Sequence, residues 1–188
     1  MIESLYATPI YYSIVKNKEE IQSSISNCID NINFSMKEEW GSTLYLSNTT
    51  FNDNIIEILG LNLLSEEIDR HLSAYCSELE FNMPEYTMTS WFTLSKKGNY
   101  SHIHHHAPAD ISGVYYYKTT EKDGSLFFES PNPHLDATRC YGKKYGESWR
   151  HPPIEGKILL FPGWLKHGVE TNETDSERIS LSFNVKYK

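Results

Sequence analysis

The chain has 188 residues, enough for a sizeable hydrophobic core, and we expect residues 1–188 to form a single domain. Its 17 basic and 25 acidic residues give a net charge of −8 at pH 7, which disfavours nucleic acid as a partner because binding to phosphate backbones depends on clustered Lys and Arg. The three cysteines, Cys28, Cys76 and Cys140, include no CxxC pair, so the sequence indicates neither a disulfide framework nor a thiolate metal site and favours a reducing cytoplasm.

The N-terminal part of the chain predicts an edge strand followed by two helices. The first residues lack the features of a signal peptide, and no run of about 18 apolar residues could span a membrane. A strand is expected over residues 5–15, near a sheet edge because it contains Pro9. Asn17 can cap the first helix, and a short strand over residues 43–46 precedes the second. His71 lies beside the apolar stripe of the second helix and is interpreted as a structural or surface group. The apolar positions at helical spacing are Ile21, Ile25, Cys28, Ile29 and Ile32 in the first helix and Leu64, Ile68, Leu72, Tyr75 and Leu79 in the second.

From Glu85 onward, short β-rich runs alternate with Gly, Pro, Asn and Asp, which is the pattern of a sandwich or barrel. The predicted fold class is therefore α+β and mainly β. A jelly-roll core over about 85–186 would be braced by the two helices of a support region over about 17–81. The expected strands are 86–95, 102–106, 112–118, 125–128, 157–161, 166–170 and 178–185.

The most distinctive stretch, residues 98–113, reads GNYSHIHHHAPADISG. Because side chains alternate along a strand, His102, His104 and His106 should share one face and His105 should point the other way. Two or three imidazoles on one face indicate a metal site. The alternative is a solvent-exposed histidine cluster without function.

A metal site of this kind needs a further ligand from elsewhere in the fold. The candidate is His167, which begins a later strand after the turn FPGW at residues 161–164. Two ligands from one strand and one from a neighbouring strand would occupy one triangular face of the coordination sphere. The opposite face would stay open, as metal-centred oxygen chemistry requires.

The last predicted strand contributes a polar face to the interior. Alternation puts Arg178, Ser180, Ser182 and Asn184 on one face and the apolar residues between them on the other. An inward-facing Arg178 can hold a carboxylate through two parallel hydrogen bonds, with Ser180 as a further donor. A surface salt bridge is the alternative role of Arg178.

Several stretches together resemble a known family. They are the histidine run and the later segments SGVYYYK, GSLFFESPNP, PPIEGKILLFPGWLKHGV and ERISLSFN. In this order they are similar to the small 2-oxoglutarate- and Fe(II)-dependent oxygenases of the prolyl-hydroxylase-like type, many of them from phages or bacteria, with the likeness running over residues 86–186. The resemblance implies a double-stranded β-helix with Fe(II) and 2-oxoglutarate as cofactors. It also implies that O2 is used to hydroxylate a C–H bond of a peptidyl or small-molecule substrate, with release of succinate and CO2.

The resemblance also assigns site residues. The iron ligands would be His104, His106 and His167, and the distal carboxylate of 2-oxoglutarate would be held by Arg178, Ser180 and Tyr116. The wider superfamily has a carboxylate as the second ligand, so Asp110 is the alternative to His106 if the strand continues past Pro108. His102 would then lie beside the site or at its entrance. Three histidines also form the first shell of zinc hydrases, so the metal identity stays open.

Two other classes of protein remain to be separated from the oxygenase. A cupin that does not use 2-oxoglutarate has partly similar signatures, but it would not need Arg178 to face inward. A non-catalytic binding module with a structural metal would need four ligands. A further hypothesis concerns the basic and aromatic segment RCYGKKYGESWRH, residues 139–151, which is expected to be a loop at the substrate entrance. Replacing Trp149 or Arg150 would then impair substrate oxidation more than 2-oxoglutarate binding.

Overall fold

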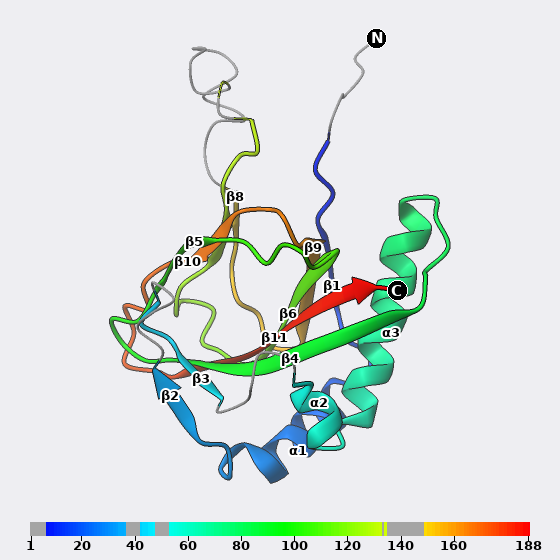
Figure 1. The fold of residues 1–188 in the computed structure, drawn as a ribbon. Coiled ribbons are helices and arrows are strands. Elements are labelled where there is room, and N and C mark those ends of the chain that lie inside the picture. Colours follow the sequence, from blue (N-terminus) through cyan, green and yellow to red (C-terminus); the bar gives the residue numbers. More distant parts are fainter. Residues whose placement is uncertain (1–6, 37–41, 48–52, 133, 135–148) are drawn as a thin grey trace.

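The computed structural model describes residues 7–36, 42–47, 53–132, 134 and 149–188. Helices and short strands fill the N-terminal part, and strands dominate the rest (Figure 1). In chain order the elements are β1 (Tyr11–Ile14), α1 (Lys18–Ile29), β2 (Phe34–Met36), β3 (Tyr45–Ser47), α2 (Ile55–Ile58), α3 (Asn62–Glu78), β4 (Tyr86–Ser95), β5 (Ser101–His104), β6 (Ile111–Lys118), β7 (Leu126–Phe128), β8 (Trp149–His151), β9 (Lys157–Pro162), β10 (His167–Val169) and β11 (Arg178–Tyr187).

The strands form two antiparallel sheets, so the protein is mainly β as expected. The larger sheet has seven strands in the order β1-β9-β6-β11-β4-β3-β2, and the smaller has four in the order β5-β10-β7-β8. At the centre of the large sheet, β11 pairs along its length with β4 on one side and with β6 on the other. These long, fully paired central strands form a stable sheet that can position the side chains of a site.

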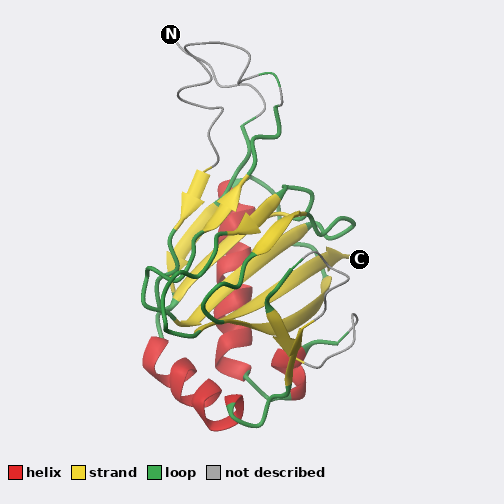
Figure 2. Cartoon of the chain, turned by 90° about the vertical axis from the view of Figure 1, so that its left-hand side faces the viewer, coloured by secondary structure: helices red, strands yellow, loops and turns green. Residues whose placement is uncertain are grey.

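The helices cover the outer face of the large sheet, as Figure 2 shows. Apolar residues of α1 and α3, such as Ile21 and Ile68, pack with the outward-facing residues of β11, such as Leu181 and Val185, and all four are fully buried. Burying one such side chain contributes about 1.5–3 kcal/mol, so this layer is the main hydrophobic core. It leaves the opposite face of the large sheet for the site.

The inner face of the large sheet packs against the small sheet. Val114 and Tyr116 of β6 are in one apolar cluster with Leu126 and Phe128 of β7, which belong to the small sheet. The two sheets therefore lie face to face, and polar residues of β11 point into the space between them.

Some expected elements differ from the observed ones. The chain has a third helix, α2, and the strand expected at residues 102–106 begins at Ser101 and ends at His104. Asn17 occupies the N-cap of α1, but its side chain makes no capping hydrogen bond. Residues 149–151, expected in a loop, form β8 at the edge of the small sheet. No helix in the described part of the chain is long and apolar enough to cross a membrane.

Candidate functional site

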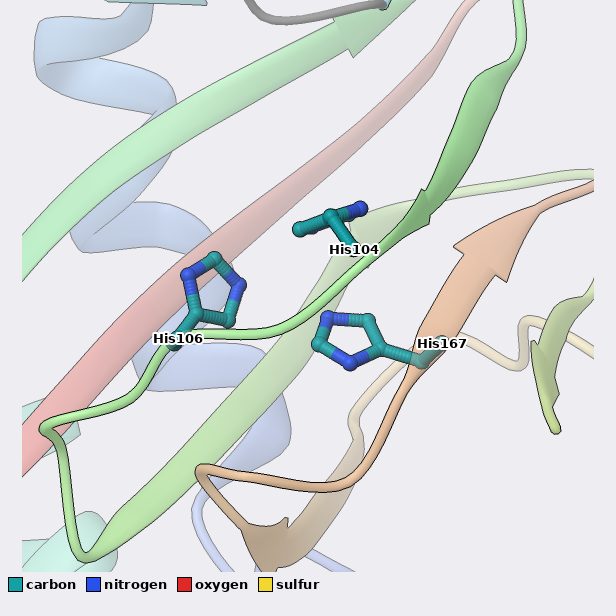
Figure 3. A group of neighbouring side chains, drawn as sticks. All are labelled: His104, His106 and His167. Carbon is teal, nitrogen blue, oxygen red and sulfur yellow. The ribbon is translucent and has the colours of Figure 1, made fainter. Parts of the chain in front are cut away.

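Three imidazoles converge between the two sheets. One potential ligand atom from each of His104, His106 and His167 lies within 4.8 Å of the others. Figure 3 shows the three rings turned toward one another, and their centroids are 4.5–5.1 Å apart. His104 ends β5 and His167 begins β10, and the two are direct partners in the antiparallel register. Strand pairing thus fixes two of the three rings.

His106 reaches the cluster by a route that strand alternation does not predict. Because β5 ends at His104, residues 105 and 106 lie in the following turn. The amide of His106 donates to the carbonyl of Gly163 at 2.8 Å, which ties this turn to the one between β9 and β10. A side chain at Gly163 would lie 2.2 Å from the carbonyl oxygen of Ala109, so only glycine allows the two turns to pack this closely.

The other residues of the histidine run lie apart from the cluster. His102 is exposed, and its ring packs against Tyr100 at 5.0 Å between centroids. His105 is also exposed, at the rim of the cavity. Asp110, the alternative ligand, instead accepts a 2.8 Å hydrogen bond from the amide of Tyr187 through Oδ2. In the described part of the chain, the cluster therefore consists of histidines without a carboxylate.

Backbone carbonyls orient two of the rings. Nδ1 of His104 lies 2.8 Å from the carbonyl oxygen of His102, and Nδ1 of His167 lies 2.8 Å from that of Leu165. A carbonyl only accepts, so Nδ1 carries the proton and the lone pair of the neutral ring is on Nε2. This is the arrangement in which metal-binding imidazoles are held by supporting hydrogen bonds.

All three rings are favoured in the neutral form. Burial lowers the pKa of His104, and it lowers the pKa of His106 to about 4 and that of His167 to about 3. The neighbouring imidazoles add to the effect on His106 and His167 because like charges would repel one another. A neutral imidazole is the form that binds a metal, so the cluster needs no proton removed at pH 7.

The histidines open onto a cavity of about 450 Å³ between the sheets, which also contains Arg178. Arg178 is 2% exposed, and its Nη1 donates to the carbonyls of Asp123 at 3.1 Å and Gly124 at 2.5 Å. Its Nε is buried with no hydrogen-bond partner in the described part of the chain. Burial lowers the pKa of the guanidinium, but arginine remains charged in proteins. The surface salt bridge considered for Arg178 is therefore excluded.

Two expected neighbours of Arg178 lie close to it. Ser180 follows on the inward face of β11 and is in register with Tyr116 of β6, and both line the cavity. Burial raises the pKa of Tyr116 to about 12, and the charge of Arg178 acts in the opposite direction. The phenol is therefore neutral and can donate a hydrogen bond.

Sequence reasoning missed the cavity residues of β4, and two residues expected at the substrate entrance lie elsewhere. Trp91 and Thr93 of β4 line the cavity, and period-two alternation in YTMTSWFTLS could have placed them on an inward face.

Trp149 and Arg150 are exposed on β8 and are not among the lining residues. Arg150 instead pairs with Glu170 at 2.6 Å. Most of the segment expected at the entrance, residues 139–148, lies outside the described residues.

The sequence matches a known family over the strands that build this site. A model of the family described as "Putative 2OG-Fe(II) oxygenase" matches residues 89–184, which is just over half of the chain. The chain belongs to this family. The oxygenase family uses Fe(II) and 2-oxoglutarate, so the expected cofactors are confirmed. A comparison with curated protein sequences gives no significant match.

Solved structures with the same fold include other oxygenases. A prolyl-4-hydroxylase from Pseudomonas putida is 14% identical with a TM-score of 0.61, and 96% of this chain and 94% of that chain are covered. HygX from Streptomyces hygroscopicus, with nickel and 2-oxoglutarate bound, is 12% identical with a TM-score of 0.66 over 96% and 84% of the two chains. The epimerase SnoN from nogalamycin biosynthesis, in complex with Fe3+, α-ketoglutarate and nogalamycin RO, is 13% identical with a TM-score of 0.66 over 96% and 79%.

The residues present in this oxygenase fit both cofactors. Three neutral imidazoles can bind one face of a divalent metal and leave other coordination positions open. At the other end of the cavity, the unpartnered Nε of the buried Arg178 needs an acceptor, which a carboxylate supplies. The distal carboxylate of 2-oxoglutarate has the chemistry that this end of the cavity requires.

Proposed function

We propose that this protein uses Fe(II), 2-oxoglutarate and O2 to hydroxylate a C–H bond of a small-molecule or peptidyl substrate, with release of succinate and CO2. The two facing sheets would be a double-stranded β-helix, the architecture implied by the family resemblance. The observation that carries the proposal is the pairing of a three-imidazole cluster with a buried guanidinium in one cavity.

In this proposal His104, His106 and His167 bind the metal. When bound, iron and 2-oxoglutarate together supply the oxidising power for the reaction. The three imidazoles would hold the metal where they line the cavity, beside the small sheet. The two carbonyls that hold His104 and His167 keep their rings from turning.

Arg178, Ser180 and Tyr116 would hold the distal carboxylate of 2-oxoglutarate. Nη1 of Arg178 is used by two backbone carbonyls, which fixes the guanidinium plane, while Nε has no partner in the described part of the chain. No Asp or Glu is among the described lining residues, so the charge of Arg178 has no carboxylate partner inside the cavity. A buried cation in this position favours an anionic ligand strongly.

The substrate would enter on the side of the metal away from Arg178. Trp91 pairs with Ser182, four positions along β11 from Arg178, and its ring lies 5.7 Å from that of His106. Asn184 is the next inward-facing residue of β11 after Ser182. Ser112 donates to Oδ1 of Asn184 at 2.7 Å, which leaves the amide NH2 of Asn184 for other partners. An apolar ring and an amide donor suit an uncharged polar substrate group.

Two features favour this function over the rival classes. A cupin without 2-oxoglutarate has no use for Arg178, whose buried charge costs several kcal/mol to maintain without a ligand. A structural metal site is usually closed by four protein ligands, and the described residues supply only three.

The proposal is tested by titrating 2-oxoglutarate into the anaerobic Fe(II) protein. Binding should produce a metal-to-ligand charge-transfer absorption band in the visible region. Replacing Arg178 with Ala should weaken 2-oxoglutarate binding by at least about tenfold, because a charge-assisted pair is lost. Arg150→Ala is the matched control, since Arg150 is outside the cavity. A protein that binds Fe(II) but never 2-oxoglutarate would contradict the proposal and favour the cupin.

A further inference from the structure

The inward face of β4 adds a residue to the carboxylate end of the cavity. Thr93 lines the cavity and is 6% exposed. It is the register partner of Ser180 on β11, and Ser180 is in turn the register partner of Tyr116 on β6. Directly paired residues in adjacent antiparallel strands have Cβ atoms about 5 Å apart. Three hydroxyl-bearing side chains therefore form one row across three neighbouring strands.

The row has no protein partners of its own. No group in the described part of the chain forms a hydrogen bond with the hydroxyls of Thr93, Ser180 or Tyr116. Arg178 lies two residues before Ser180 on the same face of β11. The buried Nε of Arg178 also has no hydrogen-bond partner in the described part of the chain. A buried donor such as this Nε is nearly always paired, which indicates an acceptor in the cavity, and the three hydroxyls face the same cavity and can donate to that acceptor.

An ionised carboxylate is the acceptor that fits this row. Its two oxygens accept about four hydrogen bonds and donate none, whereas each hydroxyl and the guanidinium can donate. The described lining residues contain no acidic group that would compete for these donors. Asp123 acts on the charge of Arg178 from outside the cavity lining, and a neutral ligand group would add nothing to that compensation.

We propose that Thr93 is a direct ligand of the distal carboxylate of 2-oxoglutarate and completes a set of donors from β4, β11 and β6. The inference rests on the proposed function, because it assumes that this carboxylate lies beside Arg178. Thr93 then helps the enzyme to select a 2-oxo dicarboxylate over a 2-oxo monocarboxylate, because the monocarboxylate has no distal carboxylate to accept hydrogen bonds from these donors.

The test compares two 2-oxo acids on the anaerobic Fe(II) protein. 2-Oxoglutarate has the distal carboxylate, and 2-oxobutanoate lacks it but has the same groups for binding the metal. Thr93→Val keeps the shape of the side chain and removes the hydroxyl. We expect it to raise the dissociation constant of 2-oxoglutarate about tenfold and to leave that of 2-oxobutanoate unchanged. Thr93→Ser, which restores a hydroxyl, should recover most of the lost affinity.

The matched control is Thr89→Val, the same substitution on the same face of the same strand, roughly 13 Å from Thr93 and outside the cavity lining. It should leave both affinities unchanged. Wild-type affinity for 2-oxoglutarate in Thr93→Val would overturn the proposal. So would an equal loss of affinity for both acids, since that indicates general distortion. A wild-type protein that binds Fe(II) but not 2-oxoglutarate would overturn the proposed function as well, so the two failures are distinguishable.

Discussion

Four histidines within five positions have distinct surroundings. His104 and His106 belong to the buried cluster, whereas His102 and His105 are exposed. The difference arises because β5 ends at His104 and the chain then turns. Imidazole chemistry alone does not determine which residue can bind a metal, because the ring must also be desolvated and oriented.

This contrast gives a prediction for single histidines. Replacing His106 with Ala removes one of three converging nitrogens, so Fe(II) affinity should fall by more than the roughly 100-fold that loss of a supporting hydrogen bond causes. His102→Ala should retain wild-type affinity, because His102 contributes its backbone carbonyl, which the substitution keeps. Anaerobic equilibrium binding of Fe(II) measures both. Equal losses in the two variants would mean that the cluster is not the metal site.

At the scale of elements, two glycines allow the close packing of the turns at the two ends of the cavity. Gly163 packs against the turn that carries His106, and a Cβ there would clash with the carbonyl of Ala109. Gly124 has φ +92°, and a Cβ would lie 2.3 Å from the carbonyl oxygen of Glu170. Gly124 also supplies a carbonyl to Arg178.

The two glycines should therefore separate the binding of metal from that of 2-oxoglutarate. Gly163→Ala should weaken Fe(II) binding, because the turn holding His106 must shift. Gly124→Ala should spare Fe(II) binding and weaken 2-oxoglutarate binding about tenfold, because Arg178 loses a fixed partner. Each variant is the control for the other, and both are compared by titration after circular dichroism has shown that they are folded. Indistinguishable effects of the two variants would contradict this assignment.

How well these elements could be predicted from the sequence depended on the length of each element and on how regularly its apolar residues repeat. Long strands with clear alternation, such as residues 86–95, were predicted at their observed bounds. Three-residue strands such as β2 and β8 contain too few residues for a period to be recognised. The same limit applied at His106, because a turn fixed by the distant Gly163 leaves no local signal. Thr93 was missed although its alternation was visible, because nothing in the sequence showed that Ser180 would lie beside it.

At the scale of the whole molecule, a buried polar group joins the helical layer to the edge of the large sheet. His71 of α3 is 0% exposed, and its Nδ1 lies 2.7 Å from the hydroxyl of Tyr11 on β1. Arg70 can only donate to Nε2, at 2.9 Å, so the proton of the neutral ring is on Nδ1. Glu67 lies 3.5 Å from Nε2, but with a neutral ring this contact is no ion pair. Of the two roles expected for His71 from the sequence, structural group or surface group, the structure therefore shows the structural one.

This group makes stability depend on pH. Burial, followed by the charge of Arg70, lowers the pKa of His71 from 6.5 to about 4. The unfolded chain therefore binds the proton more readily, so the contribution is complete above pH 6.5 and is lost as the pH falls toward 4. We expect the free energy of unfolding, measured with urea, to fall by about 2 kcal/mol from this group between pH 7 and pH 5. His71→Gln should remove that part of the pH dependence, whereas the same change at the exposed His134 should not. A variant with the wild-type slope would contradict the prediction.

The division of labour between the sheets has a mechanical consequence. The imidazoles belong to the small sheet and the turn beside it, whereas Arg178, Ser180, Tyr116 and Thr93 all belong to the large sheet. Under the proposed roles, 2-oxoglutarate would bind the metal at one end and these side chains at the other, and would therefore span the space between the two sheets. Under the proposed roles, the spacing of the two sheets would limit the length of the ligand, because a shorter acid would not reach both the metal and Arg178.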